Sequence, residues 1–141
     1  MSEAWGAKAG EGSLFVASQY WITVVELTSY ENQIADFLTP EEGEGLIAQL
    51  AQEPDEGTII PDTGGLRKLS WGGRGKASAS IGAQVIYFFR DLNMPLYLIA
   101  AFPRGERIRL RKDEKRAMRE VVEAIVASYW SKQISPLVSE S

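Results

Sequence analysis

The sequence predicts a small α+β single domain with the element order β-α-α-β-β-β-α, a mostly antiparallel sheet and the helices on one face. Two observations carry this prediction. Three runs of apolar, β-branched or aromatic residues follow one another with short links, which is typical of an antiparallel meander. A long amphipathic pattern comes after them and predicts a C-terminal helix. At 141 residues, the chain has the length of one domain.

The predicted domain begins with a strand and a short helix. Residues 1–19 are rich in Gly, Ala and Ser, and we expect a flexible N-terminal extension there. The β-branched and aromatic run Tyr20–Leu27 predicts a strand. Thr28 or Ser29 is then expected to cap a short helix over Tyr30–Phe37.

A second helix has a clear start signal. Thr39 is predicted as its N-cap, Pro40 takes the first helical position, and Glu42 completes a capping box. Pro54 ends this helix. Residues 56–65, which contain Pro and Gly-Gly, are predicted as a loop.

Three strands and a long helix complete the domain, which we expect to span residues 20–132. The last strand is apolar throughout and is therefore expected inside the sheet. A helix is expected over Asp113–Lys132, and residues 133–141 are expected to form a flexible tail. The three strands are predicted at Leu66–Trp71, Gln84–Arg90 and Leu96–Phe102.

Charge is distributed unevenly along the chain. Residues 1–59 hold one cation and eleven acids, whereas residues 60–120 hold thirteen Lys or Arg residues and six acids. A basic segment of this size favours binding to a polyanion, nucleic acid above all. The alternative is that the basic segment neutralises the acidic N-terminal part within the fold.

Several classes of chemistry are excluded by composition. The chain has no cysteine and no histidine, so it lacks disulfides, thiol chemistry, and the commonest metal ligand and general base. We expect no metal and no cofactor. No apolar run approaches the ~20 residues that span a bilayer, and residues 1–12 lack the apolar core of a secretory signal. We therefore expect a cytoplasmic protein without membrane contact.

Four segments carry a resemblance to a known family. The most specific part is a helix followed by the run P-x-x-G-x-x-I-P-x-T-G-G-L-R-K-L. In order and spacing, the segments resemble the RelE/HigB toxins of type II toxin–antitoxin systems, and among these the HigB-like branch. The segments are TPEEGEGLIAQLAQEPDEGTIIPDTGGLRKLSW (Thr39–Trp71), GGRGK (Gly72–Lys76), GAQVIYFFRD (Gly82–Asp91) and LYLIAAFPRGERIRL (Leu96–Leu110).

The resemblance implies a toxin that cleaves messenger RNA, often on the ribosome, and so inhibits translation. It also implies a cognate antitoxin that neutralises the toxin and carries a DNA-binding domain, through which the pair contacts operator DNA. In metal-free RNA cleavage the 2′-hydroxyl attacks the adjacent phosphate and the 5′-oxygen leaves. This reaction needs a base, an acid and cations around the phosphate. Without histidine, Lys and Arg are expected to carry these roles.

The candidate site residues are cations on the predicted strands and their connections. Arg67 and Lys68 point to opposite faces of one strand, so only one of them reaches a site on the open face, and the sequence leaves open which one. The resemblance places further catalytic cations after the last strand. The candidate catalytic residues are Lys68, Arg67, Arg104 and Arg107, and the candidate RNA-binding residues are Arg74, Lys76, Arg90, Arg109 and Arg111.

Two departures from the family pattern leave the activity open. Gln84 stands where ribonuclease members commonly have an arginine of the active cluster. The tyrosine that several members use after the third strand is absent, and Ile108 and Leu110 are the nearby residues. The alternatives are a gyrase-type inhibitor on the same fold, like the ParE relatives, and a decayed protein that binds RNA or a partner without cleaving it.

Overall fold

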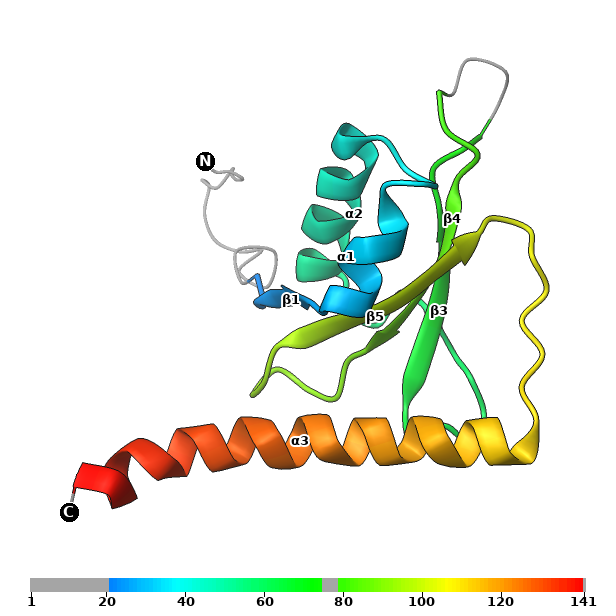
Figure 1. The fold of residues 1–141 in the computed structure, drawn as a ribbon. Helices are drawn as coiled ribbons and strands as arrows, with labels where there is room; N and C mark the ends of the chain where they lie inside the picture. The colour runs from blue at the N-terminus through cyan, green and yellow to red at the C-terminus, as the bar shows by residue number, and fades with distance from the viewer. Residues whose placement is uncertain (1–20, 75–78, 141) are drawn as a thin grey trace, which may run out of the picture.

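The computed structural model describes residues 21–74 and 79–140, with side chains up to residue 132. The predicted extension at residues 1–19 and the candidate Lys76 lie outside the described residues. The elements are β1 (Val24–Glu26), α1 (Thr28–Ile34), α2 (Pro40–Gln52), β2 (Thr58–Ile59), β3 (Leu66–Trp71), β4 (Ala83–Phe88), β5 (Leu96–Pro103) and α3 (Lys112–Glu140). The predicted α+β domain is confirmed, and the element order differs only by the added β2 (Figure 1).

The five strands form one sheet in the order β1-β5-β4-β3-β2. β3, β4 and β5 are the predicted antiparallel meander, and β2 adds antiparallel to β3. β1 pairs parallel with β5, with Val24 opposite Leu96. β5 therefore lies inside the sheet, as its continuous apolar sequence predicted.

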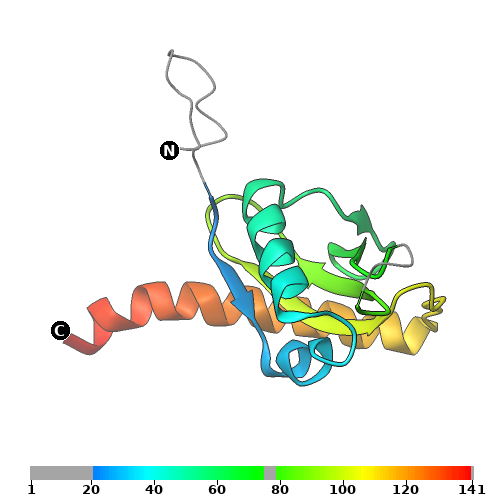
Figure 2. The same cartoon turned by 90° about the horizontal axis from the view of Figure 1, so that it is seen from above.

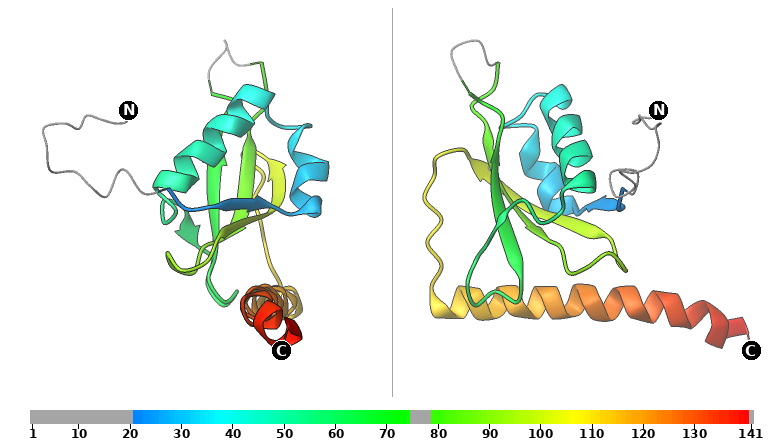
Figure 3. Two further views of the ribbon diagram at one scale, coloured as in Figure 1. Left: turned by 90° about the vertical axis from the view of Figure 1, so that its left-hand side faces the viewer. Right: turned by 180° about the vertical axis from the view of Figure 1, so that it is seen from behind.

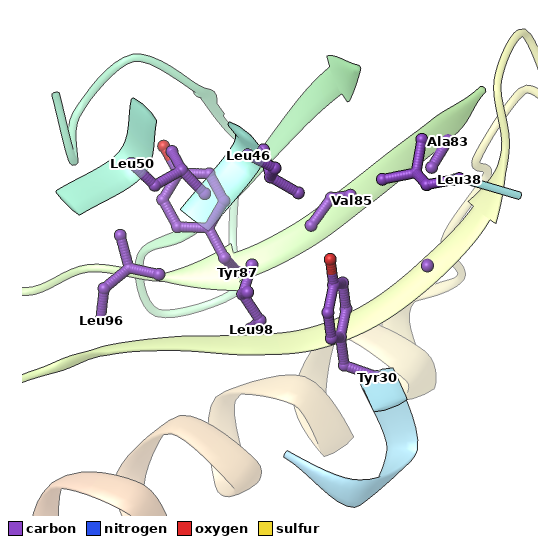
Figure 4. Close-up of a cluster of buried hydrophobic side chains, with 10 residues drawn as sticks. Tyr30, Leu38, Leu46, Leu50, Ala83, Val85, Tyr87, Leu96 and Leu98 are labelled. Carbon is purple, nitrogen blue, oxygen red and sulfur yellow. The ribbon is translucent and has the colours of Figure 1, made fainter. Parts of the chain in front are cut away.

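α1 and α2 cover one face of the sheet. Tyr30 from α1 and Leu46 and Leu50 from α2 are almost fully buried, and they pack on side chains of β4 and β5 (Figure 4). Side chains alternate along each strand, and the register shift at Ile86/Tyr87 brings Ala101 to the same face as Leu96 and Leu98. The strand residues of this cluster are Ala83, Val85, Tyr87, Leu96, Leu98 and Ala101.

The predicted capping box of α2 is present. Thr39 Oγ1 accepts a hydrogen bond from Glu42 N (3.1 Å), and Glu42 Oε1 accepts one from Thr39 N (3.0 Å). The predicted cap of α1 is wrong, because α1 starts at Thr28 and its N-cap is Leu27, whose side chain has no oxygen. Ser29 instead donates its hydroxyl hydrogen to Ile99 O (2.6 Å), which ties α1 to β5.

α3 packs on the opposite face, so the expectation that all helices share one face is wrong for this helix. Val122 is buried there in a second cluster, against side chains of β3, β4 and the turn before β5. Apolar side chains of the meander point to both faces of the sheet. Each face must therefore be buried against a helix. Figure 2 looks down on α2, with the sheet and then α3 behind it, and Figure 3 gives two further views of this arrangement. The other buried members are Ile60, Leu66, Ile86, Phe88 and Met94.

The backbone of α3 stays helical through Glu140, although the sequence analysis ends this helix at Lys132. The added part includes Pro136, whose type normally disfavours a helix interior. In Figure 1 the C-terminal part of α3 extends beyond the sheet.

The hydroxyl of Tyr87 fixes the loop between α2 and β2. It accepts a hydrogen bond from Gly57 N (2.7 Å) and donates one to Pro54 O (2.9 Å). Burial raises the pKa of this hydroxyl, so it keeps the proton that it donates. A Cβ atom on Gly57 would lie 2.7 Å from the hydroxyl oxygen, so only glycine fits there.

We predict that Tyr87→Phe lowers the free energy of unfolding by about 1–3 kcal/mol, because it leaves the buried Gly57 N–H without an acceptor. Urea denaturation measures the change. Tyr129→Phe is the matched control, because the Tyr129 hydroxyl is exposed where it meets Asn93 O (3.3 Å). We expect the control to lie within about 0.5 kcal/mol of wild type, and an equal loss in both variants would contradict the assignment.

Candidate functional site

The side chains of Arg67 and Lys68, which are adjacent on β3, lie on opposite faces of the sheet. Leu66 packs in the cluster under α3, whereas Leu69 and Trp71 pack against the cluster under α1 and α2. Because side chains alternate along a strand, Lys68 lies on the α3 face and Arg67 lies on the α2 face. The structure thus decides which of the pair shares a face with α3.

Arg67 is engaged in the fold. Its Nη1 donates hydrogen bonds to Asp55 O (3.0 Å) and Gly57 O (2.8 Å), so the guanidinium holds the α2–β2 loop against β3. Its Nε is buried and has no hydrogen-bond partner within the described part of the chain. Arg67 is therefore separated from the other candidate catalytic cations.

Arg104 reaches from the end of β5 across β4 to the end of β3. Its backbone N donates to Gly82 O (3.0 Å), and its Nη1 donates to Gly72 O (2.9 Å). Gly82 makes this path possible, because a Cβ atom there would lie 3.0 Å from Arg104 Cδ and 2.6 Å from Gly72 O. Gly82 also has a φ of 85°, which side chains disfavour.

A cleft of about 440 Å³ opens beside this arginine. Arg104 and Arg74 contribute the two cations of its lining, and Ser70 contributes a hydroxyl from the α3 face of β3. Lys68 precedes Ser70 on the same face, about 7 Å away along the strand. Among the described residues, neither Lys68 nor Arg74 has a hydrogen-bond or ion-pair partner. The lining residues are Glu56, Ser70, Trp71, Gly72, Arg74 and Arg104.

Glu56 and Ser70 also line this site, although no sequence pattern predicted them there. Glu56 is the one carboxylate among the described lining residues, and it accepts a hydrogen bond from Gln49 Nε2 (2.5 Å). The register of β2 positions Glu56. Because Thr58 of β2 pairs with Lys68 of β3, Glu56, two residues before Thr58, lies beside Ser70, two residues after Lys68. No sequence signal predicted β2, because this strand has only two residues.

Gln84 lies in the row of side chains next to the cleft. On β4 it stands opposite Ser70 of β3 and Phe102 of β5. Its Oε1 is buried and has no hydrogen-bond partner within the described residues. A neutral amide thus occupies the position between Ser70 and Phe102, on the face of the sheet that also carries Lys68.

The other candidate cations do not join the cleft. Arg107 and Arg109 are exposed in the link between β5 and α3. Arg111 Nε lies 3.5 Å from both Asp113 Oδ1 and Glu114 Oε1, in the first turn of α3.

Arg90 follows β4 at the opposite end of the sheet from the cleft. It lines a separate pocket with Arg119 of α3, and its Nε lies 3.9 Å from Asp91 Oδ2. The structure therefore brings Arg74 and Arg104 together in the cleft, places Lys68 on the same face of β3 as the cleft residue Ser70, and separates all three from Arg90.

Glu42 holds the hairpin that follows β3. Its Oε2 accepts from Gly73 N (3.3 Å), and its backbone O accepts from Trp71 Nε1 (2.9 Å). A hydrogen bond from Ser80, followed by the bond from Thr39 N, lowers the pKa of Glu42 from 4.5 to about 2. The start of α2 thus fixes both legs of the hairpin that carries Arg74.

No family model matches this chain. Within the described part, no group of three or more acidic side chains is placed to hold a metal ion. The helices described here include none that combines the length and the apolar character needed to cross a membrane.

We predict that the neighbours Arg67 and Lys68 respond differently to substitution. Arg67→Ala should lower the free energy of unfolding by about 1–3 kcal/mol, because Asp55 O and Gly57 O lose their donor. Lys68→Ala should change it by no more than about 0.5 kcal/mol. Urea denaturation of both variants tests this, and a larger loss for Lys68→Ala would reverse the assignment.

The low pKa of Glu42 predicts a pH-dependent contribution to stability. A carboxylate with a folded-state pKa of about 2 and an ordinary value of 4.5 stabilises the fold above pH 4.5. This contribution disappears as the pH falls towards 2. Glu42→Gln should therefore be less stable than wild type at pH 7, with a difference that shrinks at pH 2–3. Thermal unfolding at each pH measures it, and Glu41→Gln, exposed in the same turn, is the control.

Proposed function

We propose that this chain is the toxin of a toxin–antitoxin pair and a metal-free endoribonuclease that cleaves messenger RNA in the cytoplasm. The observation that supports this most is the cleft that Arg74 and Arg104 line at one end of the sheet, with Lys68 on the same face of β3 as the cleft residue Ser70. Cations that have no ion-pair partner among the described residues favour a polyanion, and the RelE/HigB resemblance suggests RNA and its cleavage.

Arg104 is the proposed phosphate ligand. Only Nη1 of its guanidinium donates to Gly72 O, so further N–H donors remain for phosphate oxygens. This bond and the close fit over Gly82 hold the side chain in place before RNA binds. A donor that is fixed in advance stabilises charge on a transition state without reorganisation. Arg74 and the exposed Arg107 would then bind neighbouring phosphates of the strand.

Glu56 and Lys68 are the proposed proton carriers. In this mechanism the Glu56 carboxylate accepts the proton of the 2′-hydroxyl, the 2′-oxygen forms a bond to phosphorus, and the bond from phosphorus to the 5′-oxygen breaks. The Lys68 ammonium protonates the leaving 5′-oxygen. The products are a 2′,3′-cyclic phosphate and a 5′-hydroxyl end, with no metal or cofactor.

The same cations suit the proposed antitoxin. An acidic segment that covers Lys68, Arg74 and Arg104 would neutralise their charge and exclude RNA from the cleft. In this proposal, DNA contact belongs to the DNA-binding domain of the antitoxin, and the toxin reaches mRNA on the ribosome.

Gln84 favours one alternative, which is RNA binding without efficient cleavage. Next to the cleft residue Ser70, a neutral amide supplies one positive charge fewer than the arginine of the resembled ribonucleases. Charge stabilisation of the transition state falls with each lost cation, whereas ground-state binding depends less on it. If the wild type binds RNA without cutting it, Gln84→Arg should introduce cleavage.

We predict that Arg104→Ala lowers the rate of RNA cleavage by a factor of about 10²–10³, as expected for one lost donor to the reacting phosphate. The purified full chain is incubated with end-labelled mRNA in a chelator-containing buffer. Cleavage should give 2′,3′-cyclic phosphate ends, and a 2′-deoxy substitution at the cut site should abolish it.

Arg116→Ala is the matched control, since it removes an exposed arginine of α3 outside the cleft. We expect wild-type cleavage from this variant and wild-type circular dichroism spectra from both. Equal loss in both variants would mean that general positive charge, rather than the cleft, acts on RNA. If the folded wild-type chain neither binds nor cleaves RNA, the proposed function is refuted.

A further inference from the structure

We propose that an apolar groove at the start of β1 and β5 is the docking site for the chain's own segment Leu14-Phe15-Val16. This inference does not rest on the proposed function, because the groove lies at the opposite end of β5 from the cleft that Arg104 lines.

The groove has a volume of about 680 Å³ and is lined by residues from four parts of the chain. The residues before β1, the end of α2, the turn between β4 and β5, and α3 all contribute to its lining. None of the described lining residues is charged. The main apolar contributors are Trp21, Ile22, Pro54, Leu92, Met94 and Tyr129.

Large apolar side chains at this groove remain exposed to solvent. Leu92 is 74% exposed and Trp21 is 54% exposed. Trp130, which is 43% exposed, stands edge-to-face with the groove residue Tyr129, with a ring centroid distance of 5.2 Å. Clustered exposure of this kind marks a surface that another apolar group covers.

Backbone hydrogen bonds hold the walls of the groove in place. Ile22 N donates to Ala51 O (3.1 Å), which fixes the chain before β1 to the end of α2. Leu96 N donates to Thr23 O (2.9 Å), and the Tyr129 hydroxyl donates to Asn93 O (3.3 Å). These bonds fix the walls of the groove in advance, which lowers the entropic cost of docking.

The chain itself supplies an apolar segment next to this groove. Residues 1–20 join the described structure at Trp21, which lines the groove. Leu14-Phe15-Val16 is the one run of three large apolar residues in that stretch. The link from Val16 to Trp21 reaches at most about 17 Å when extended, so the run stays near the groove.

Charge and tethering both favour this occupant. Residues 12–20 contain no charged side chain, so docking in an uncharged groove removes no charge from water. The tether gives the segment an effective concentration on the order of millimolar, which a separate partner rarely reaches. We infer that Phe15 is the main apolar contact, because it is the largest side chain of the run.

Disulfide trapping tests the proposal directly, because the natural chain has no cysteine. Ser13→Cys and Asn93→Cys are introduced together into the full chain, and disulfide formation is followed at low protein concentration in a defined redox buffer. We expect an intramolecular disulfide. Adding Phe15→Asp should slow its formation at least tenfold, whereas Ala9→Asp, which adds the same charge outside the run, should not.

Binding of an apolar fluorescent dye provides a second measurement that needs no cysteine. Phe15→Asp in the otherwise unchanged chain should increase dye fluorescence severalfold by uncovering Leu92 and Trp21, while Ala9→Asp should not. Equal trapping rates with and without Phe15→Asp, together with unchanged dye binding, would overturn the proposal. A disulfide between two molecules would overturn it in favour of a second copy as the source of the segment.

Discussion

The meander β3-β4-β5 has apolar side chains on both of its faces, and the rest of the structure depends on burying both. α1 and α2 cover Val85, Tyr87 and Leu98 on one face, and α3 covers Ile86 and Phe88 on the other. Because adjacent residues of one strand point to opposite faces, each strand contributes to both clusters. The connections are arranged accordingly, with the two short helices before the meander and the long helix after it (Figure 1).

This two-sided packing also determines where polar chemistry is possible. On its face of the sheet, α3 packs near the beginning of β3. Ser70 lies at the other end of β3 on the same face and is exposed. The cleft forms there, where Gly72 and Gly82 let the backbone and Arg104 approach closely. Glu42 fixes the hairpin from the other side of the sheet. The candidate site thus depends on close backbone contacts as much as on its cations.

The proposed RNA site and the proposed docking groove lie at the two ends of β5, and they differ in chemistry. The cleft has two arginines in its lining, whereas the groove has no charged residue among those described. β5, which joins them, is hydrogen-bonded to β1 on one side and to β4 on the other. A substitution at one end is therefore expected to leave the other end unchanged, so the two proposals stand or fall separately.

The sequence by itself determined the fold class, the meander and the capping box at Thr39 and Glu42. These features are local, because strand periodicity, turn residues and cap spacing act within a few positions. Only the tertiary structure decided that α3 covers the second face of the sheet and that β1 pairs parallel with β5. It also decided that Arg67 donates hydrogen bonds to the α2–β2 loop, whereas Lys68 lies on the α3 face. The place of Glu56 beside Ser70 was likewise decided by the register of the two-residue β2. Each of these depends on contacts between residues far apart in the chain, which no local pattern encodes.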